Sequence, residues 1–269
     1  MEQPANDPLR SRLVLLGASN LFLAFPSALR HALGLLAGSE VSVYAAHGPG
    51  RSYGVEAGVP GLKFPGIARS GLLEAIEREH EEHGAAPVTA LVTDIGNDIL
   101  YRSGVDRILE WIEEVVARLR VIGANVAITS LPRENLEAIP AWKFRLLRPL
   151  FYPFRPMERD EVLRQMREVQ ERLEELGWRR GIPILPTRSE WYGFDHFHLR
   201  RDAHDAAFGS WIDTVLPRKE TPTCGGDPLA AGGARLRLHR PAEFVLLGMR
   251  RRRSPRGWTI APGARLFSF

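Results

Sequence analysis

The chain has 269 residues and a formal net charge of +4, and 44% of its residues are hydrophobic. This composition is typical of a globular protein and excludes collagen-like, coiled-coil and wholly disordered chains. No uninterrupted run of about 18 apolar residues predicts a membrane-spanning helix. The polar segment 1–10 does not resemble a secretory signal peptide, and the single cysteine, Cys224, can form no intramolecular disulfide. We therefore expect a cytoplasmic protein.

Positive charge is concentrated in the last fifth of the chain. Residues 218–269 contain 11 basic and 3 acidic residues, so this segment carries +8 and residues 1–217 carry −4. Its glycine clusters predict partial disorder, and its four consecutive arginines at 250–253 can bind nucleic acid or another anionic surface such as acidic lipid. We therefore expect one domain over 1–217 and a basic, irregular, partly disordered extension over 218–269.

Apolar runs alternate with amphipathic segments through the first part of the chain. In chain order, these patterns predict a strand at 12–16, a helix at 19–36, a strand at 41–46, a helix at 68–83, a strand at 88–93, a helix at 106–122, a strand at 125–129, a helix at 159–176, a strand at 182–185 and a helix at 203–215. Strands without polar alternation are typical of sheets that are covered on both faces. The predicted fold is α/β, a doubly wound parallel sheet of five strands between helix layers.

One internal segment does not fit the alternation of strands and helices. Residues 140–157 mix aromatic and basic residues with four prolines. We expect an irregular surface insertion there, packed by its own aromatic side chains or bordering a ligand site.

Ligands of such folds bind at the carboxyl ends of the strands. Ser19 follows the first predicted strand and begins the first helix, where main-chain N–H groups point outward. Taken alone, a serine at this position is most often a helix cap. Asp195 and His198 lie three residues apart before the last helix, a spacing that lets a carboxylate orient an imidazole and the imidazole activate a hydroxyl. The alternative for this histidine-rich segment is a metal site.

Two further strand ends carry polar, glycine-rich segments. The segment 94–98 (Asp-Ile-Gly-Asn-Asp) follows the third predicted strand, and a side-chain amide there can donate to an oxyanion. The segment 48–54 (Gly-Pro-Gly-Arg-Ser-Tyr-Gly) follows the second strand, and a glycine there lets a main-chain N–H approach a substrate oxygen. Each segment alone is equally typical of an ordinary turn.

Together, these segments resemble the sequence blocks of the SGNH hydrolases, the GDSL-like esterase and lipase superfamily. The Gly-Asp-Ser block is matched by Gly17-Ala18-Ser19, with Ala18 in place of the acid, and the glycine of the second block by Gly50. The Gly-x-Asn-Asp block is matched by residues 95–98, with Ile95 in place of the first glycine, and the Asp-x-x-His block is matched in full. The resemblance covers residues 12–217 and implies a flavodoxin-like three-layer sandwich.

The resemblance also implies roles for individual residues. Ser19 would be the nucleophile, His198 the general base and Asp195 the residue that orients it. The Ser19 and Gly50 N–H groups and the Asn97 amide would form the oxyanion hole. Three neighbouring side chains are expected to contact the substrate: Asn20, Arg51 and Asp98. No metal or organic cofactor is implied.

The implied reaction is hydrolysis of an acyl ester through an acyl-enzyme. The triplet Gly50-Arg51-Ser52 resembles that of carbohydrate acetyl esterases in the superfamily and favours a short-chain substrate such as an acetylated sugar. The alternative is a catalytically inactive protein of the same fold that binds a carbohydrate or acyl group. A dinucleotide-binding fold is disfavoured because the segment after Ser19 lacks the further glycines of that fingerprint.

Overall fold

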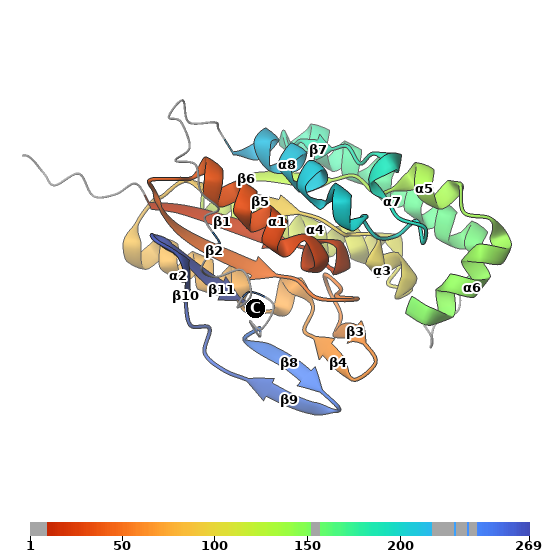
Figure 1. The fold of residues 1–269 in the computed structure, drawn as a ribbon, viewed down its shortest axis with the longest axis horizontal. Coiled ribbons are helices and arrows are strands. Elements are labelled where there is room, and N and C mark those ends of the chain that lie inside the picture. The colour runs from red at the N-terminus through yellow and green to blue at the C-terminus, as the bar shows by residue number, and fades with distance from the viewer. Residues whose placement is uncertain (1–9, 152–156, 217–228, 230–235, 237–240) are drawn as a thin grey trace, which may run out of the picture.

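The structure is a computed structural model that describes residues 10–151, 157–216, 229, 236 and 241–269, apart from the side chains at 148–151. Helices cover both faces of a mostly parallel sheet, so the molecule has three layers (Figure 1). The predicted α/β class is therefore confirmed.

The main sheet contains seven strands within the described residues, in the order β10-β11-β2-β1-β5-β6-β7. The strands are β1 (Arg10–Leu16), β2 (Glu40–Ala46), β5 (Val88–Val92), β6 (Asn125–Thr129), β7 (Ile184–Leu185), β10 (Trp258–Ala261) and β11 (Ala264–Ser268). Neighbours are parallel except β10 and β11. The order β2-β1-β5-β6-β7 is that of flavodoxin-like sheets, in which the direction of winding reverses between β1 and β5.

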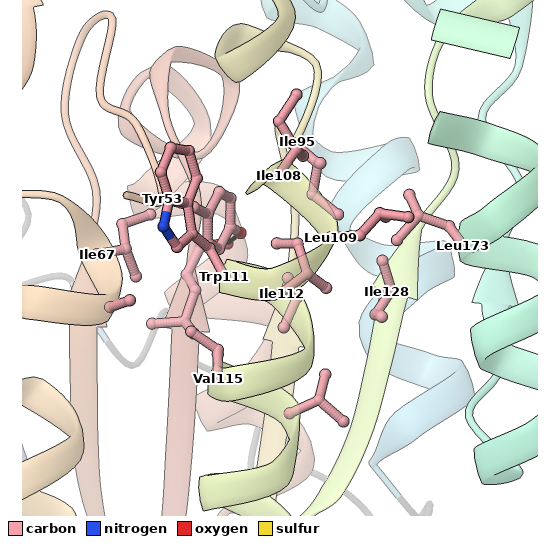
Figure 2. Close-up of a cluster of buried hydrophobic side chains, with 14 of the residues drawn as sticks. Tyr53, Ile67, Ile95, Ile108, Leu109, Trp111, Ile112, Val115, Ile128 and Leu173 are labelled. Atoms are coloured by element: carbon pink, nitrogen blue, oxygen red, sulfur yellow. Dashed lines mark hydrogen bonds between the residues drawn. The ribbon is translucent and has the colours of Figure 1, made fainter. Parts of the chain in front are cut away.

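Alternate side chains of the strands face the two helix layers. Leu13 and Leu15 of β1 pack with α1 and α8, whereas Val14 and Leu16 pack with the opposite layer of α2, α4 and α7. Figure 2 shows the second of these cores, where Ile108, Ile112 and Val115 of α4 lie against the sheet. The long helices are α1 (Ser19–Leu35), α2 (Leu72–His83), α4 (Val105–Val121), α7 (Arg159–Arg180) and α8 (His204–Val215). Burial on both faces explains why the central strands are almost wholly apolar.

Shorter helices connect these elements near the carboxyl ends of the strands. They are α3 (Asn97–Leu100), α5 (Arg133–Glu137) and α6 (Ala141–Phe151), with 3-10 turns at Ile67–Arg69, Ser189–Trp191 and Arg201–Ala203. Helix α6 corrects the prediction of an irregular segment at 140–157. Pro140 precedes the helix, where its missing N–H breaks no helical bond, and its carbonyl accepts from the Phe144 N–H at 3.0 Å.

The C-terminal segment differs most from its prediction. The five expected strands lie within two residues of β1, β2, β5, β6 and β7, but β10 and β11 raise the sheet to seven strands. Ala264, Leu266 and Ser268 of β11 are buried on alternate positions, and β11 runs parallel to β2. Strands from both sides of the predicted boundary at residue 217 therefore belong to one sheet. Partial disorder was expected over 218–269. Residues 243–268 contain four strands, whereas 218–240 lie almost entirely outside the described residues.

The same segment also forms half of a second sheet. Its strand order is β3-β4-β8-β9, from β3 (Ala57–Val59), β4 (Leu62–Phe64), β8 (Glu243–Leu246) and β9 (Met249–Arg252). Arg250 forms ion pairs with Glu56 and Glu243, and Arg252 Nε lies 2.8 Å from Glu243. Part of the basic run thus pairs with acids of the protein itself. Its contact with an anionic surface stays a prediction.

A buried arginine joins the loop after β2 to the end of the chain. Arg51 is fully buried, and its guanidinium donates to the main-chain oxygens of Pro65 at 3.1 Å, His47 at 3.3 Å and Phe269. Burial lowers the pKa of Arg51 to about 9. The Phe269 N–H in turn donates to Ala45 at 2.9 Å. Arg51 therefore joins the loop after β2, the segment at Pro65 and the end of the described chain at Phe269.

Replacing Arg51 with methionine tests this role. Arg51→Met keeps an apolar stem but leaves the three main-chain oxygens without their donor, so we expect a loss on the order of 3 kcal/mol in the free energy of unfolding. Urea unfolding measures this loss. Arg10→Met is the matched control, because Arg10 pairs with Glu40 while half exposed, and such a pair contributes about 1 kcal/mol or less. Equal losses in the two variants would contradict the assigned role.

Candidate active site

The candidate site lies at the carboxyl ends of β1 and β5, where the winding of the sheet reverses. The Thr93 N–H donates to Leu16 at 2.8 Å, and the Gly17 N–H donates to Ala46 at 3.1 Å, so the ends of three strands are joined. A Cβ atom on Gly17 would lie 2.2 Å from Thr93 Oγ1. The chain can therefore leave β1 and begin α1 at this point only with glycine.

The three residues predicted as catalytic lie in hydrogen-bond contact. Ser19 Oγ is 3.0 Å from His198 Nε2, and His198 Nδ1 is 2.7 Å from Asp195 Oδ2. Ser19 is the first residue of α1, whereas the other two lie on the loop between β7 and α8. A hydroxyl, an imidazole and a carboxylate in this order can transfer a proton away from the hydroxyl as it attacks an electrophile.

The Asp195 carboxylate also shapes the loop that carries His198. Its Oδ1 accepts the main-chain N–H groups of Phe197 at 3.0 Å and His198 at 2.9 Å, while Oδ2 faces the His198 ring. Partial burial by itself raises the pKa of Asp195, but the bonds from His198 and Phe197 outweigh it and hold the pKa below its usual value. Asp195 is therefore ionised at neutral pH and favours the tautomer of His198 with a proton on Nδ1.

Asn20 joins the serine and histidine segments. Its Nδ2 donates to Phe197 O at 3.2 Å and to Asp94 Oδ1 at 2.9 Å, and its Oδ1 accepts the Leu199 N–H at 2.8 Å. Asn20 borders the cavity in front of Ser19. Its amide is engaged by these bonds, so Asn20 positions both segments, and its contact with the substrate stays a prediction.

Asp94 is a site residue to which the sequence analysis assigned no role. Its Oδ2 accepts the N–H groups of Ala18 at 2.7 Å and Leu21 at 3.1 Å, on either side of Ser19. Asp94 has a φ of 62°, a left-handed conformation that is uncommon outside glycine and is often found at functional sites. Its position directly after the strand next to β1 is the signal that could have identified it.

The three residues predicted for the oxyanion hole border one cavity. Ser19, Gly50 and Asn97 all line it. Gly50 has a φ of 65°, and a Cβ there would lie 2.9 Å from Gly58 O, so the loop needs glycine at this position. Tyr101 donates its hydroxyl to Gly50 O, and Asn97 Nδ2 donates to Arg51 O at 3.4 Å. These bonds fix the Gly50 loop against the segment that carries Asn97.

Arg51 and Asp98 do not contact the cavity, which corrects their predicted role in substrate binding. Both side chains are fully buried. Asp98 accepts the Ser52 hydroxyl and, at 3.0 Å, the Tyr53 N–H. Burial raises the pKa of Asp98 to about 6, although these hydrogen bonds oppose the shift. Both residues therefore stabilise the loop that contains Gly50 from behind.

The cavity in front of Ser19 has a volume of about 250 Å³. Polar residues such as Ser19, Asn97 and His198 line it. Most of the other lining residues are apolar side chains from α1, α3, α7 and the segment after β6. Within the described part of the chain, no three His, Cys, Asp or Glu residues converge in a way that could hold a metal ion. None of the described helices is long and apolar enough to cross a membrane.

Comparisons with known proteins add a distant likeness. No family model matches the chain, and no curated protein matches it. One similar solved structure is that of the psychrotrophic esterase EstA from Pseudoalteromonas sp., inhibited by monoethylphosphonate. The identity is 14%, the match covers 75% of this chain and 94% of the EstA chain, and the TM-score is 0.44.

Replacing Asp94 with asparagine tests its positioning role. Asparagine has one acceptor oxygen, so Asp94→Asn cannot accept from Ala18, Leu21 and Asn20 together, and an amide hydrogen then faces a donor. We expect about a tenfold to hundredfold fall in kcat for ester hydrolysis with little change in KM, because the Ser19 hydroxyl loses its alignment.

The control for this variant is Asp106→Asn, an exposed carboxylate at the start of α4 that pairs with Arg172. Thermal unfolding separates a local from a global effect. A fall in kcat that merely follows the fraction of unfolded protein would show that Asp94 acts on stability alone.

The raised pKa of Asp98 predicts a dependence of stability on pH. The folded state holds the proton of Asp98 up to about pH 6, whereas an unfolded aspartate loses it near pH 3.9. Protonation therefore stabilises the fold, and this group adds about 1 kcal/mol to the free energy of unfolding as the pH falls from 7 to 5. Urea unfolding of wild type and Asp98→Asn at both pH values measures it, since other groups cancel in the comparison. An identical response of both proteins would contradict the shift.

Proposed function

We propose that this protein is a serine hydrolase that cleaves carboxylic esters through an acyl-enzyme, with a site of the SGNH type. The observation that carries the proposal is the chain of contacts from Ser19 Oγ to His198 Nε2 at 3.0 Å and from His198 Nδ1 to Asp195 at 2.7 Å. This order of groups generates a nucleophile from a serine hydroxyl.

In the first half of the proposed reaction, Ser19 Oγ attacks the ester carbonyl carbon while His198 Nε2 takes its proton. Asp195 stabilises the imidazolium that forms. As the tetrahedral intermediate collapses, the bond to the alcohol oxygen breaks, and His198 gives that oxygen its proton. The alcohol leaves, and the acyl group remains on Ser19.

In the second half, water replaces the alcohol. His198 takes a proton from water as its oxygen attacks the acyl carbon, then returns the proton to Ser19 Oγ when the acid is released. The reaction needs a small-molecule ester and water, and every proton transfer is assigned to a residue of this site. The proposal therefore implies no metal and no organic cofactor.

The oxyanion of both intermediates is assigned to three donors that border the cavity: the N–H groups of Ser19 and Gly50 and the side-chain amide of Asn97. The Ser19 N–H lies at the N-terminus of α1, where the helix dipole also favours negative charge. Loss of one such donor costs about 3–4 kcal/mol of transition-state stabilisation.

Selection of an acetylated sugar has less support than ester hydrolysis. It depended on the triplet Gly50-Arg51-Ser52, but the last two side chains are fully buried and bond to the protein itself. The triplet therefore supports the shape of a loop and offers a sugar only the main chain of Gly50.

Hydrolysis of p-nitrophenyl esters by wild type and Ser19→Ala tests the proposal. We expect a fall of at least about 10³-fold in kcat for Ser19→Ala, because the remaining residues supply no nucleophile. Ser27→Ala, a second serine of α1, is the matched control and should keep wild-type activity.

Equal rates for Ser19→Ala and wild type would contradict the proposal. The alternative of an inactive binding protein predicts a different pattern: no hydrolysis by either protein, together with binding of an ester that Ser19→Ala retains.

A further inference from the structure

Apolar side chains make up most of the lining of the cavity in front of Ser19. The polar lining includes Ser19, Asn97 and His198, together with Thr129, Ser130 and Tyr192. The apolar lining includes Ile99 and Leu100 of α3, Leu131 and Leu136 around α5, and Val162 and Met166 of α7. An ester that reacts at Ser19 therefore lies in a cavity whose wall is largely hydrocarbon.

The inner wall is part of the protein's main core. Ile99 and Val162 are each 2% exposed, and Met166 is not exposed at all. These side chains are packed on nearly all sides and close the inner end of the cavity, which has a volume of about 250 Å³. An apolar ligand in this space would contact this hydrocarbon wall.

The mouth of the cavity is apolar as well. Phe22 and Leu23 of α1 are 44% and 50% exposed, and Val59 of β3 is 37% exposed, yet all three line the same cavity. Large exposed apolar side chains gathered at one opening mark a binding surface more than isolated ones do. They give a hydrocarbon chain a continuous apolar path to Ser19.

The charges around the cavity also favour an uncharged substrate. The described residues that line the cavity include no lysine or arginine, and the carboxylate of Asp94 is engaged by Ala18, Leu21 and Asn20. The cavity therefore offers an anionic group no lysine or arginine among the described residues, and most of its lining is apolar. Burial there favours a neutral hydrocarbon.

From these observations we infer that the site selects esters of medium-chain fatty acids, with the acyl chain lying between α3 and α7. The inference rests on the proposed ester hydrolysis and replaces the short acyl group that the sequence favoured. An apolar cavity of roughly 150 Å³ holds a benzene molecule, so this one accommodates a chain on the order of eight carbons.

The test is the hydrolysis of p-nitrophenyl esters from acetate to dodecanoate. Each buried methylene group contributes about fourfold to kcat/KM, so octanoate should exceed acetate by at least about a hundredfold, with a decline at longer chains. Val162→Phe fills the inner end of the cavity and should lower the octanoate-to-acetate ratio at least about tenfold. Met166→Ala enlarges the cavity and should move the optimum to longer chains.

Leu163→Phe is the matched control, because Leu163 is a buried neighbour on α7 that does not line the cavity. It should leave the ratio unchanged, and thermal unfolding of all three variants separates selectivity from loss of fold. An acetate preference in wild type, or a chain-length profile that neither Val162→Phe nor Met166→Ala alters, overturns the inference while ester hydrolysis stands. Absence of hydrolysis with every ester contradicts the proposed function instead.

Discussion

The contact between Asp94 and the start of α1 is the interaction on which the rest of the site depends. One carboxylate accepts N–H groups on both sides of Ser19 and, through Asn20, joins the loop that carries His198. Ser19, His198 and the end of β5 are thereby held as one unit. Ala18 leaves the first segment without an acid of its own, and Asp94, two residues after the end of the neighbouring strand β5, supplies the carboxylate that contacts it.

The opposite side of the site is supported by buried charge. Arg51 and Asp98 lie behind the loop of Gly50 and bond to main-chain groups and to Ser52, out of reach of the cavity. Burial of two ionisable groups is costly, and the bonds of Asp98 and of Arg51 Nε and Nη1 offset part of this cost, whereas Arg51 Nη2 has no hydrogen-bond partner among the described residues. The bonds that form favour one conformation of this loop. Because Arg51 also donates to Phe269, the C-terminal strand β11 contributes to the support of the site.

Periodicity and glycine placement were sufficient to predict the central fold. Strands that are buried on both faces appear in the sequence as apolar runs, and Gly17 and Ser19 mark the end of the first strand. Five neighbouring strands of the sheet, β2, β1, β5, β6 and β7, could therefore be predicted from the sequence. The C-terminal strands were not predicted, because the arginines at 250–253 dominated the composition of this segment. Its Pro262-Gly263 turn joins β10 and β11 into a hairpin, and alternate residues of β11 are buried.

The candidate site could be predicted to a similar degree. Spacing indicated that Asp195 and His198 can reach each other, and the resemblance to the SGNH hydrolases implied Ser19 as their partner. Spacing could not separate side chains that face the cavity from those that face the core, which is why Arg51 and Asp98 were expected to bind substrate. The roles of Asn20 and Asp94 depend on bonds between segments more than 70 residues apart, which no local pattern records.

Covalent labelling of Ser19 tests the central claim most directly. Incubation of the protein with a fluorophosphonate, followed by mass spectrometry of the digested chain, is expected to find one phosphonyl group on the peptide that contains Ser19. His198→Ala should slow the labelling strongly, because the base that activates the hydroxyl is gone. Hydrolysis of esters by a protein that carries no adduct on Ser19, or labelling at a different residue that abolishes turnover, would contradict the account.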